Sequence, residues 1–272
     1  MGEKTPNVKI SAYGVTVGIE VEDEERRSRV IEQMCETIPL GFTFLDRESS
    51  VDHEFSIRNS EKLGKFDLFK GEETVIEDVD EKTLLERLDS RVRITIAEFA
   101  VGYVFVHAGV VTVKNRAIII PASSFAGKTT LVAELVKLGA VYYSDEYAVF
   151  DKDGLVHPFP KMLSMRERDG SGTQHDTPVE AFGGIAGEEA VKPGLVLVTR
   201  YKKYARWKPE ILSSGQGVLE IISHTVPIRN DPAFSLRVLN QVVLNAVVVK
   251  SDRGEVERFA KMLLEFSFET IQ

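Results

Sequence analysis

The chain has 272 residues, of which 43% are apolar and 28% charged, a composition that fits a folded globular protein and excludes a disordered one. Its net charge of −8 argues against nonspecific binding to nucleic acid or to an anionic membrane. The single cysteine, Cys35, excludes an intrachain disulfide framework. The N-terminal sequence MGEKTPNVK lacks the apolar segment of a signal peptide, and the longest apolar stretch, 99–113, is shorter than a membrane span. We therefore expect a cytoplasmic protein.

Residues 1–80 predict a small α+β region. Alternating apolar residues on both sides of Tyr13-Gly14 predict a hairpin. Residues 22–38 predict a helix with an acidic start and one apolar face. Short strands are expected at residues 42–45, 54–58 and 73–76.

Residues 81–272 predict a second, larger unit in which strands and helices alternate. It begins with a helix at 81–100 that Gly102 would end, followed by two strands joined by a turn at 114–116. Further expected elements are a turn at 151–154, a strand at 194–199, and two amphipathic helices that start near Pro232 and Gly254. Residues 166–190 show no period and predict a long loop of the kind that often forms a lid.

Residues 117–130, AIIIPASSFAGKTT, have the sequence of a phosphate-binding P-loop. A short apolar strand leads into small residues, and a helix with apolar residues at helical spacing follows. The expected nucleotide contacts are Ala122, Ser123, Ser124, Phe125, Ala126, Gly127, Lys128, Thr129 and Thr130.

The spacing of these residues suits a bound nucleoside triphosphate. Backbone N–H groups and the positive end of the helix dipole would face the phosphates. Lys128 would reach the outer phosphates, and the Thr129 hydroxyl would be a ligand of Mg²⁺. The consensus has a glycine where this chain has Ala122, so a positive φ at that position would strain the loop.

An acidic pair, Asp145 and Glu146, follows Lys128 by about one helix and one strand. A strand that returned beside the P-loop strand would bring both carboxylates near the γ-phosphate. One of them would then bind Mg²⁺ and the other would accept a proton from an attacking hydroxyl. Upstream, His107 lies in an otherwise apolar strand, where a histidine is more often a satisfied core residue.

The segment from Phe105 to Gly154 resembles the catalytic core of the HPr kinase/phosphorylase family, whose fold is related to that of the ATP-dependent phosphoenolpyruvate carboxykinases. In that family a histidine-bearing strand precedes the P-loop, and a paired acidic motif follows it. The resemblance covers about residues 100–160 and implies an α/β fold with a mixed sheet around a P-loop core. This chain is most similar to the HPr-kinase-related proteins, because the glycine-rich signature of true HPr kinases is missing.

The resemblance also implies roles for particular residues. Lys128 would bind the β- and γ-phosphates, Thr129 and Glu146 would hold Mg²⁺, and Asp145 would be the base toward a serine hydroxyl. His107 would lie near the reacting phosphate. This chain has Asp-Glu where HPr kinases have Asp-Asp. Because HPr kinases are hexamers, a homo-oligomer is a further expectation.

Residues 200–208, RYKKYARWK, carry five cations and three aromatic rings. One interpretation is a loop that clamps the nucleotide, with Arg200 or Lys202 on a phosphate and an aromatic ring stacked on the base. The alternative is a solvated turn with its rings half packed. Arg166 is a further candidate phosphate contact.

The leading functional hypothesis is a kinase: an ATP- and Mg²⁺-dependent phosphotransferase that acts on a hydroxyl, most simply a serine, of a protein, peptide or small molecule. The first alternative is a small-molecule kinase of the nucleoside-monophosphate or shikimate type, for which an all-parallel sheet is expected. The second is a nucleotide-binding regulator that has lost catalysis. The sequence leaves the acceptor open, and it does not distinguish ATP from GTP, ADP or pyrophosphate. It has no G-x-S-x-G, no G-x-G-x-x-G and no zinc spacing among its histidines.

Overall fold

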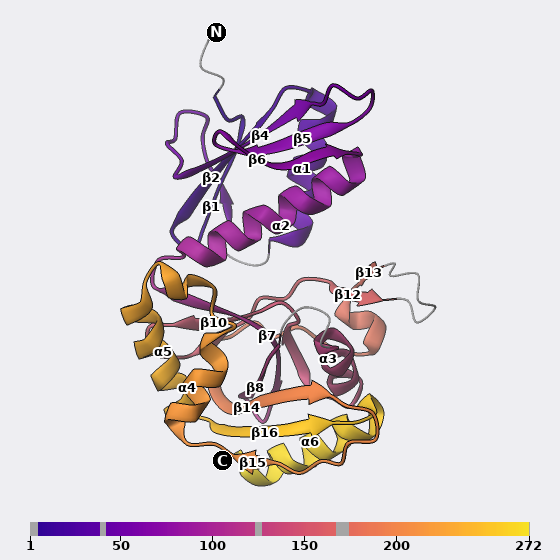
Figure 1. Ribbon diagram of the computed structural model, residues 1–272, viewed down its shortest axis with the longest axis vertical. Helices are drawn as coiled ribbons and strands as arrows, with labels where there is room; N and C mark the ends of the chain where they lie inside the picture. Colours follow the sequence, from indigo (N-terminus) through magenta and orange to yellow (C-terminus); the bar gives the residue numbers. More distant parts are fainter. Residues whose placement is uncertain (1–4, 39–41, 123–126, 167–173, 272) are drawn as a thin grey trace. The chain divides into compact units, whose positions relative to one another are not determined.

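The computed structural model describes residues 5–38, 42–122, 127–166 and 174–271. The chain divides into two compact units, Met1–Val101 and Gly102–Gln272 (Figure 1). The sequence pattern predicts a boundary near residue 80, whereas the division in the structure falls after Val101. The helix at 81–99 therefore belongs to the first unit.

The first unit is a mixed sheet covered by two helices. Its strands lie in the order β3-β1-β2-β4-β5-β6, with β2 and β4 parallel and the other neighbours antiparallel. Their bounds are β1 Val8–Ala12, β2 Val15–Val21, β3 Thr43–Phe44, β4 His53–Asn59, β5 Phe66–Lys70 and β6 Glu73–Val79. The predicted hairpin is confirmed, since Tyr13 and Gly14 both have the positive φ that a tight type I′ turn needs. Strand β5 was not anticipated.

Helices α1 (Glu24–Thr37) and α2 (Glu81–Phe99) pack against each other and against this sheet. Each begins at an aspartate, Asp23 or Asp80, whose side chain accepts a hydrogen bond from a backbone N–H of the first turn. The buried stripe of α2 consists of Leu84, Leu88, Val92 and Ile96, which join the core of this sheet. This burial explains why the contacts assign α2 to the first unit.

The second unit is built on a larger mixed sheet. Its strands lie in the order β11-β10-β7-β8-β14-β16-β15, and β9 also pairs with β7. Their bounds are β7 Tyr103–Val113, β8 Arg116–Pro121, β9 Val141–Ser144, β10 Tyr147–Asp151, β11 Val156–His157, β14 Lys192–Tyr201, β15 Glu210–Ile211 and β16 Val247–Arg253. Strand β8 is antiparallel to β7 and parallel to β14, which is parallel to β16. The α/β class with a mixed sheet is therefore confirmed.

Helices cover both faces of this sheet, so the second unit has three layers (Figure 1). Alternate residues of β8 point to opposite faces: Ile118 and Ile120 meet α3 (Lys128–Lys137) and α6 (Val256–Thr270), whereas Ile119 meets α5 (Pro232–Leu244). Helix α4 (Ser214–Ile222) packs beside α5 on that second face. A central strand buried on both sides gives α3 a rigid base.

Other predictions for this unit were correct in part. The turn at 114–116 is confirmed, since Lys114 and Asn115 have positive φ between β7 and β8. The prediction of a long loop at 166–190 is wrong at Arg166 and for 174–182. Strand β12 (Leu163–Arg166) pairs with β13 (Gln174–Thr177), and a 3₁₀ turn follows at Val179–Phe182. Residues 167–173 lie outside the described part. Strand β16 and helix α4 were not anticipated.

Among the described residues, no helix is long and apolar enough to cross a membrane.

Truncation of Leu88 tests the placement of α2 in the first core. Leu88 is 0% exposed, so Leu88→Ala is expected to lower the free energy of unfolding by about 2–5 kcal/mol. Ile94, on the same helix, is 43% exposed, and Ile94→Ala is expected to change it by about 0.5 kcal/mol or less. Urea denaturation followed by circular dichroism measures both. Equal losses in the two variants would contradict the packing described for α2.

Candidate nucleotide-binding site

The site begins where β8 leads into α3. Gly127 is the N-terminal cap of α3 and has φ 74°, a left-handed conformation that glycine adopts without strain. Ala122 is not among the described residues with positive φ, so the missing glycine of the consensus does not strain the backbone there. The predicted contacts Ser123, Ser124, Phe125 and Ala126 lie outside the described residues.

The stem of Lys128 passes directly over β7 at Gly109. A Cβ atom on Gly109 would lie 2.6 Å from Val132 Cγ2 and 3.0 Å from Lys128 Cγ. Gly109 therefore provides the space that lets α3 and the lysine stem approach the sheet. The sequence does not single out Gly109, because a glycine within an apolar strand gives no signal of which side chains will pack over it.

Lys128 is buried, with 8% of its surface exposed, and lies against the ring of His107. Its Nζ is 3.1 Å from Nδ1 and 3.4 Å from Nε2 of that ring. His107 Nδ1 is 2.7 Å from Ala122 O, and because a carbonyl oxygen only accepts, Nδ1 carries a proton. Nε2 is then the ring nitrogen that can accept a hydrogen bond from the Lys128 ammonium. This contact favours a neutral imidazole.

Burial sets the protonation of both groups. Desolvation, and then the charge of Lys128, lower the pKa of His107 below its usual value. Desolvation also lowers the pKa of Lys128 to about 8, although Asp145 and Glu146 act in the opposite direction. The site thus keeps a cation at neutral pH against an unfavourable desolvation energy, which an anionic ligand would offset.

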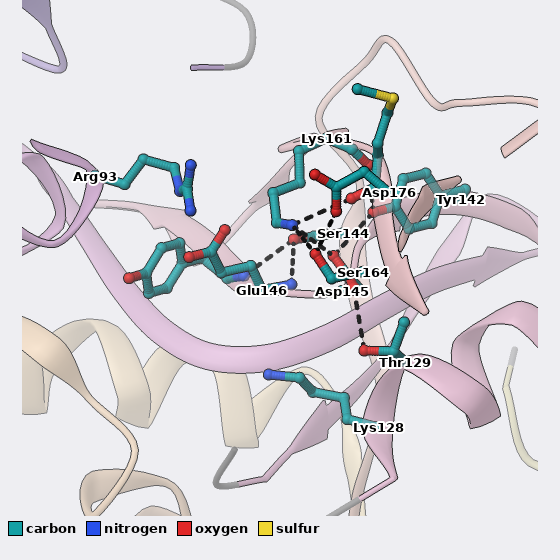
Figure 2. A network of polar contacts seen from close by, with 12 residues as sticks. Arg93, Lys128, Thr129, Tyr142, Ser144, Asp145, Glu146, Lys161, Ser164 and Asp176 are labelled. Atoms are coloured by element: carbon teal, nitrogen blue, oxygen red, sulfur yellow. Dashed lines mark hydrogen bonds and ion pairs between the residues drawn. The ribbon is translucent and has the colours of Figure 1, made fainter. Parts of the chain in front are cut away.

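Asp145 faces Lys128 and Thr129 from the other side of the site (Figure 2). It is 4% exposed, and its Oδ2 accepts a hydrogen bond of 3.1 Å from Thr129 Oγ1. The single Tyr142 O–H lies 3.3 Å from Asp145 Oδ1 and 2.8 Å from Lys161 O. Burial raises the pKa of Tyr142, so its hydroxyl remains a neutral donor.

A break between two strands places the acidic pair here. Strands β9 and β10 both pair with β7, at Val110–Thr112 and at Tyr103–His107 respectively. Asp145 and Glu146 fill the gap between them, where Ala108 N donates to Glu146 O. Ser144 Oγ accepts from the N–H groups of Glu146 and Tyr147, which fixes the turn. The acids were expected beside the P-loop strand itself, but β7 lies between, because the chain pairs with the far edge of β7.

Lys161 is a site residue that the sequence analysis missed. Its ammonium lies 3.9 Å from Asp145 Oδ1 and donates to Met162 O and Ser164 Oγ, each at 3.1 Å. Ser164 in turn donates to Asp176 Oδ1 at 2.7 Å, which connects the site to the β12–β13 hairpin (Figure 2). Lys161 lies in a segment without any recognisable motif, so only the tertiary fold reveals its position.

Arg253, at the end of β16, is a basic residue that contacts Gly127. It is 5% exposed, and its Nη2 donates to Gly127 O at 3.2 Å. The predicted phosphate contacts Arg200 and Lys202 are exposed and form ion pairs with Asp252 instead. The side chain of Arg166 lies outside the described part of the chain. Arg253 was missed because nothing in the sequence shows that β16 ends beside Gly127.

The donors of the site suit Mg²⁺ bound together with phosphate. Among the described residues, no group of three or more His, Cys, Asp or Glu side chains is placed so that it could hold a metal ion by itself. Mg²⁺, however, takes only one or two protein ligands beside phosphate oxygens and waters. Its ligand distances of about 2.0–2.1 Å place neighbouring octahedral ligands about 3 Å apart. The 3.1 Å between Thr129 Oγ1 and Asp145 Oδ2 matches this spacing.

Comparisons with known proteins add little to this geometry. No family model matches the chain, and no curated protein matches it. Among solved structures, an HPr(Ser) kinase/phosphatase from Coxiella burnetii is similar over 61% of this chain and 97% of its own, with 14% identity and a TM-score of 0.31. A likeness at this TM-score does not bear on the function.

The buried ammonium of Lys128 has a consequence for stability. Burial lowers the pKa of Lys128 from 10.5 to about 8, so the unfolded chain binds more protons between these values and stability rises with pH across that window. At pH 7 the full penalty is present. Lys128→Met is therefore expected to raise the free energy of unfolding at pH 7 by on the order of 3 kcal/mol, with a smaller gain near pH 10.

Denaturant titrations at pH 7 and pH 10 measure this difference. Lys137, which is half exposed near the end of the same helix, provides the matched control. Lys137→Met is expected to change stability little at either pH. A loss of stability in Lys128→Met at pH 7 would show that the lysine is not held against a desolvation penalty.

Proposed function

We propose that this protein is an ATP- and Mg²⁺-dependent phosphotransferase that transfers the γ-phosphoryl group to a hydroxyl of a protein, peptide or small molecule. One observation carries the proposal. A buried lysine, the Thr129 hydroxyl and a buried carboxylate converge at the N-terminus of α3, directly after the P-loop sequence. These are the groups that phosphoryl transfer requires for positioning and charge stabilisation.

The phosphates would lie at the N-terminus of α3. The helix dipole and the backbone N–H groups of its first turn favour anions there. Lys128 supplies a cation whose desolvation penalty a polyphosphate would offset, and His107 orients that ammonium through Nε2. Because His107 is neutral, it adds no charge that would compete with Mg²⁺.

The geometry favours Asp145, with Thr129, as the ligand of Mg²⁺, which leaves Glu146 as the base toward the acceptor hydroxyl. This assignment exchanges the two roles that the resemblance implied. Asp145 shares a hydrogen bond with Thr129 and is the more deeply buried acid of the pair. Glu146 is close enough to Lys128 and His107 to influence the pKa of each. Its longer side chain suits a group that must reach an incoming substrate.

Lys161 would balance part of the negative charge of Asp145 at the metal site. Its ammonium is 3.9 Å from Asp145, so it partly neutralises that carboxylate while no divalent ion is bound. When bound, Mg²⁺ would supply the charge that neutralises the phosphates and the developing negative charge of the transfer step. Lys161 is tethered by Met162 O and Ser164 Oγ, which keeps it beside the metal position.

The sheet topology favours one of the two kinase hypotheses. The nucleoside-monophosphate and shikimate type was expected to have an all-parallel sheet around the P-loop strand. Here β8 is antiparallel to β7, and both segments that flank the acidic pair are antiparallel to β7 as well. This arrangement supports the leading hypothesis. The alternative of an inactive regulator shares the same fold and is distinguished only by assay.

Labelled phosphate transfer tests the proposed function. Purified protein incubated with γ-labelled ATP, Mg²⁺ and a lysate of the host is expected to label a hydroxyl acceptor, which is then identified by mass spectrometry. Lys128→Ala is expected to reduce the rate by about 10³-fold, because a preorganised cation is lost from the transition state. Lys137→Ala is the control and is expected to retain wild-type activity. Tight ATP binding without any transfer would favour the regulator, and full activity in Lys128→Ala would refute the site.

The exchange of roles in the acidic pair predicts different kinetic defects. Asp145→Asn is expected to raise the Mg²⁺ concentration for half-maximal activity by at least about tenfold, because it removes a charged ligand. Glu146→Gln is expected to lower kcat by about 10²–10⁴-fold at an unchanged Mg²⁺ requirement, because it removes the proton acceptor. Steady-state rates across a Mg²⁺ series measure both. The reverse pattern would restore the roles that the resemblance implied.

A further inference from the structure

A second hollow lies at the carboxyl ends of β14 and β16. It has a volume of about 460 Å³, and two segments line it, residues 204–207 and residues 254–262. Aromatic and apolar side chains form much of its wall: Tyr204, Trp207, Phe259 and Met262. Arg206, Glu255 and Arg258 contribute polar groups. None of these residues belongs to the phosphate site described above.

The hollow lies on the same edge of the sheet as the P-loop. Strands β8, β14 and β16 are parallel neighbours, so their carboxyl ends meet at one edge, where ligands of α/β sheets bind. Two strand spacings separate β8 from β16, about 10 Å, a distance that the inner phosphate and ribose of a nucleotide span. Arg253, the residue before the lining segment, donates to Gly127 O and so connects the two places directly.

Tyr204 is held in an unusual position at the rim. It is 83% exposed and has φ 65°, a conformation that bulky residues rarely adopt. The loop is fixed on β16 because Lys202 N donates to Arg253 O, and Ala205 N donates back to Lys202 O. A Cβ on Gly254 would lie 2.8 Å from Ala205 O, so glycine permits this close approach. Exposed rings in strained backbone of this kind are found at ligand clamps.

The opposite wall is rigid. Trp207 packs edge-on against Phe259 and Phe266, with ring centroids 5.2 Å and 5.6 Å apart. These contacts anchor the indole to the core between α3 and α6. A fixed indole and an exposed phenol on one loop offer flat surfaces to a planar ring system.

We propose that this hollow binds the base and ribose of the nucleoside triphosphate whose phosphates lie at Lys128. This inference rests on the proposed function and adds the part of the ligand that the phosphate site does not contact. Tyr204 and Trp207 contact the base, Glu255 accepts a hydrogen bond from a ribose hydroxyl, and Arg253 lies between the hollow and the phosphates. An anionic tail fits this arrangement, because Arg253 and Lys128, which lie along its path, are both basic.

The fluorescence of Trp207 provides the test, since it is the only tryptophan in the chain. ATP is expected to change its emission in a saturable way. Inorganic tripolyphosphate, which carries the phosphates without base or ribose, is expected to bind by calorimetry while leaving the emission unchanged. Tyr204→Ala is expected to weaken ATP binding about tenfold through loss of stacking, and to leave tripolyphosphate binding as in the wild type.

The controls separate a failure of this inference from a failure of the phosphate site. Phe268 is half exposed on α6 outside the hollow, and Phe268→Ala is expected to bind both probes as the wild type does. If Tyr204→Ala leaves ATP binding unchanged and Lys128→Ala weakens both probes, the hollow does not take the base and the phosphate site stands. If Lys128→Ala leaves both probes unaffected, the phosphate site itself is refuted.

Discussion

The arrangement depends on one electrostatic constraint: a lysine ammonium held in the protein interior opposite a buried carboxylate. Lys128 and Asp145 come from segments that approach from different directions, one from the start of α3 and one from the gap between β9 and β10. Burial penalises each charge, and the neighbouring groups reduce that penalty without removing it from Lys128. His107 lies against the ammonium, and Thr129 and Lys161 lie against the carboxylate.

The apolar core of the second unit offsets the free-energy cost of burying these charges. Strand β8 is buried on both faces, between α3 and α6 on one side and α5 on the other, and this packing fixes the strand that leads to α3. Gly109 lets the stem of Lys128 lie close to β7. Gly127 turns the chain into α3, and Arg253 donates a hydrogen bond to the carbonyl oxygen of Gly127. Apolar packing thus supplies the stability that the polar site reduces, a balance seen where proteins preorganise charge for catalysis.

The same edge of the sheet collects every feature that the functional proposals use. Parallel strands β8, β14 and β16 end there: β8 leads toward Gly127 and Lys128, the aromatic and basic segment 202–208 follows β14, and Arg253 ends β16. The antiparallel strands on the other side of β8 bring the acids. Under the proposed function, the parallel half of the mixed sheet would hold the nucleotide, and the antiparallel half would hold the metal and the acceptor. This division follows from strand direction.

The sequence by itself determined the local features: the P-loop strand and helix, the β7–β8 turn at Lys114 and Asn115, and the α/β class, because turn chemistry and hydrophobic period act over a few residues. It also supplied Lys128 and the acidic pair as candidates. Only the tertiary structure decided that Lys161 and Arg253 join the site, that α2 covers the first sheet, and that β7 lies between the acids and the P-loop strand. The physical reason is that these outcomes depend on pairing between distant strands, for which an isolated lysine or arginine in the chain gives no signal.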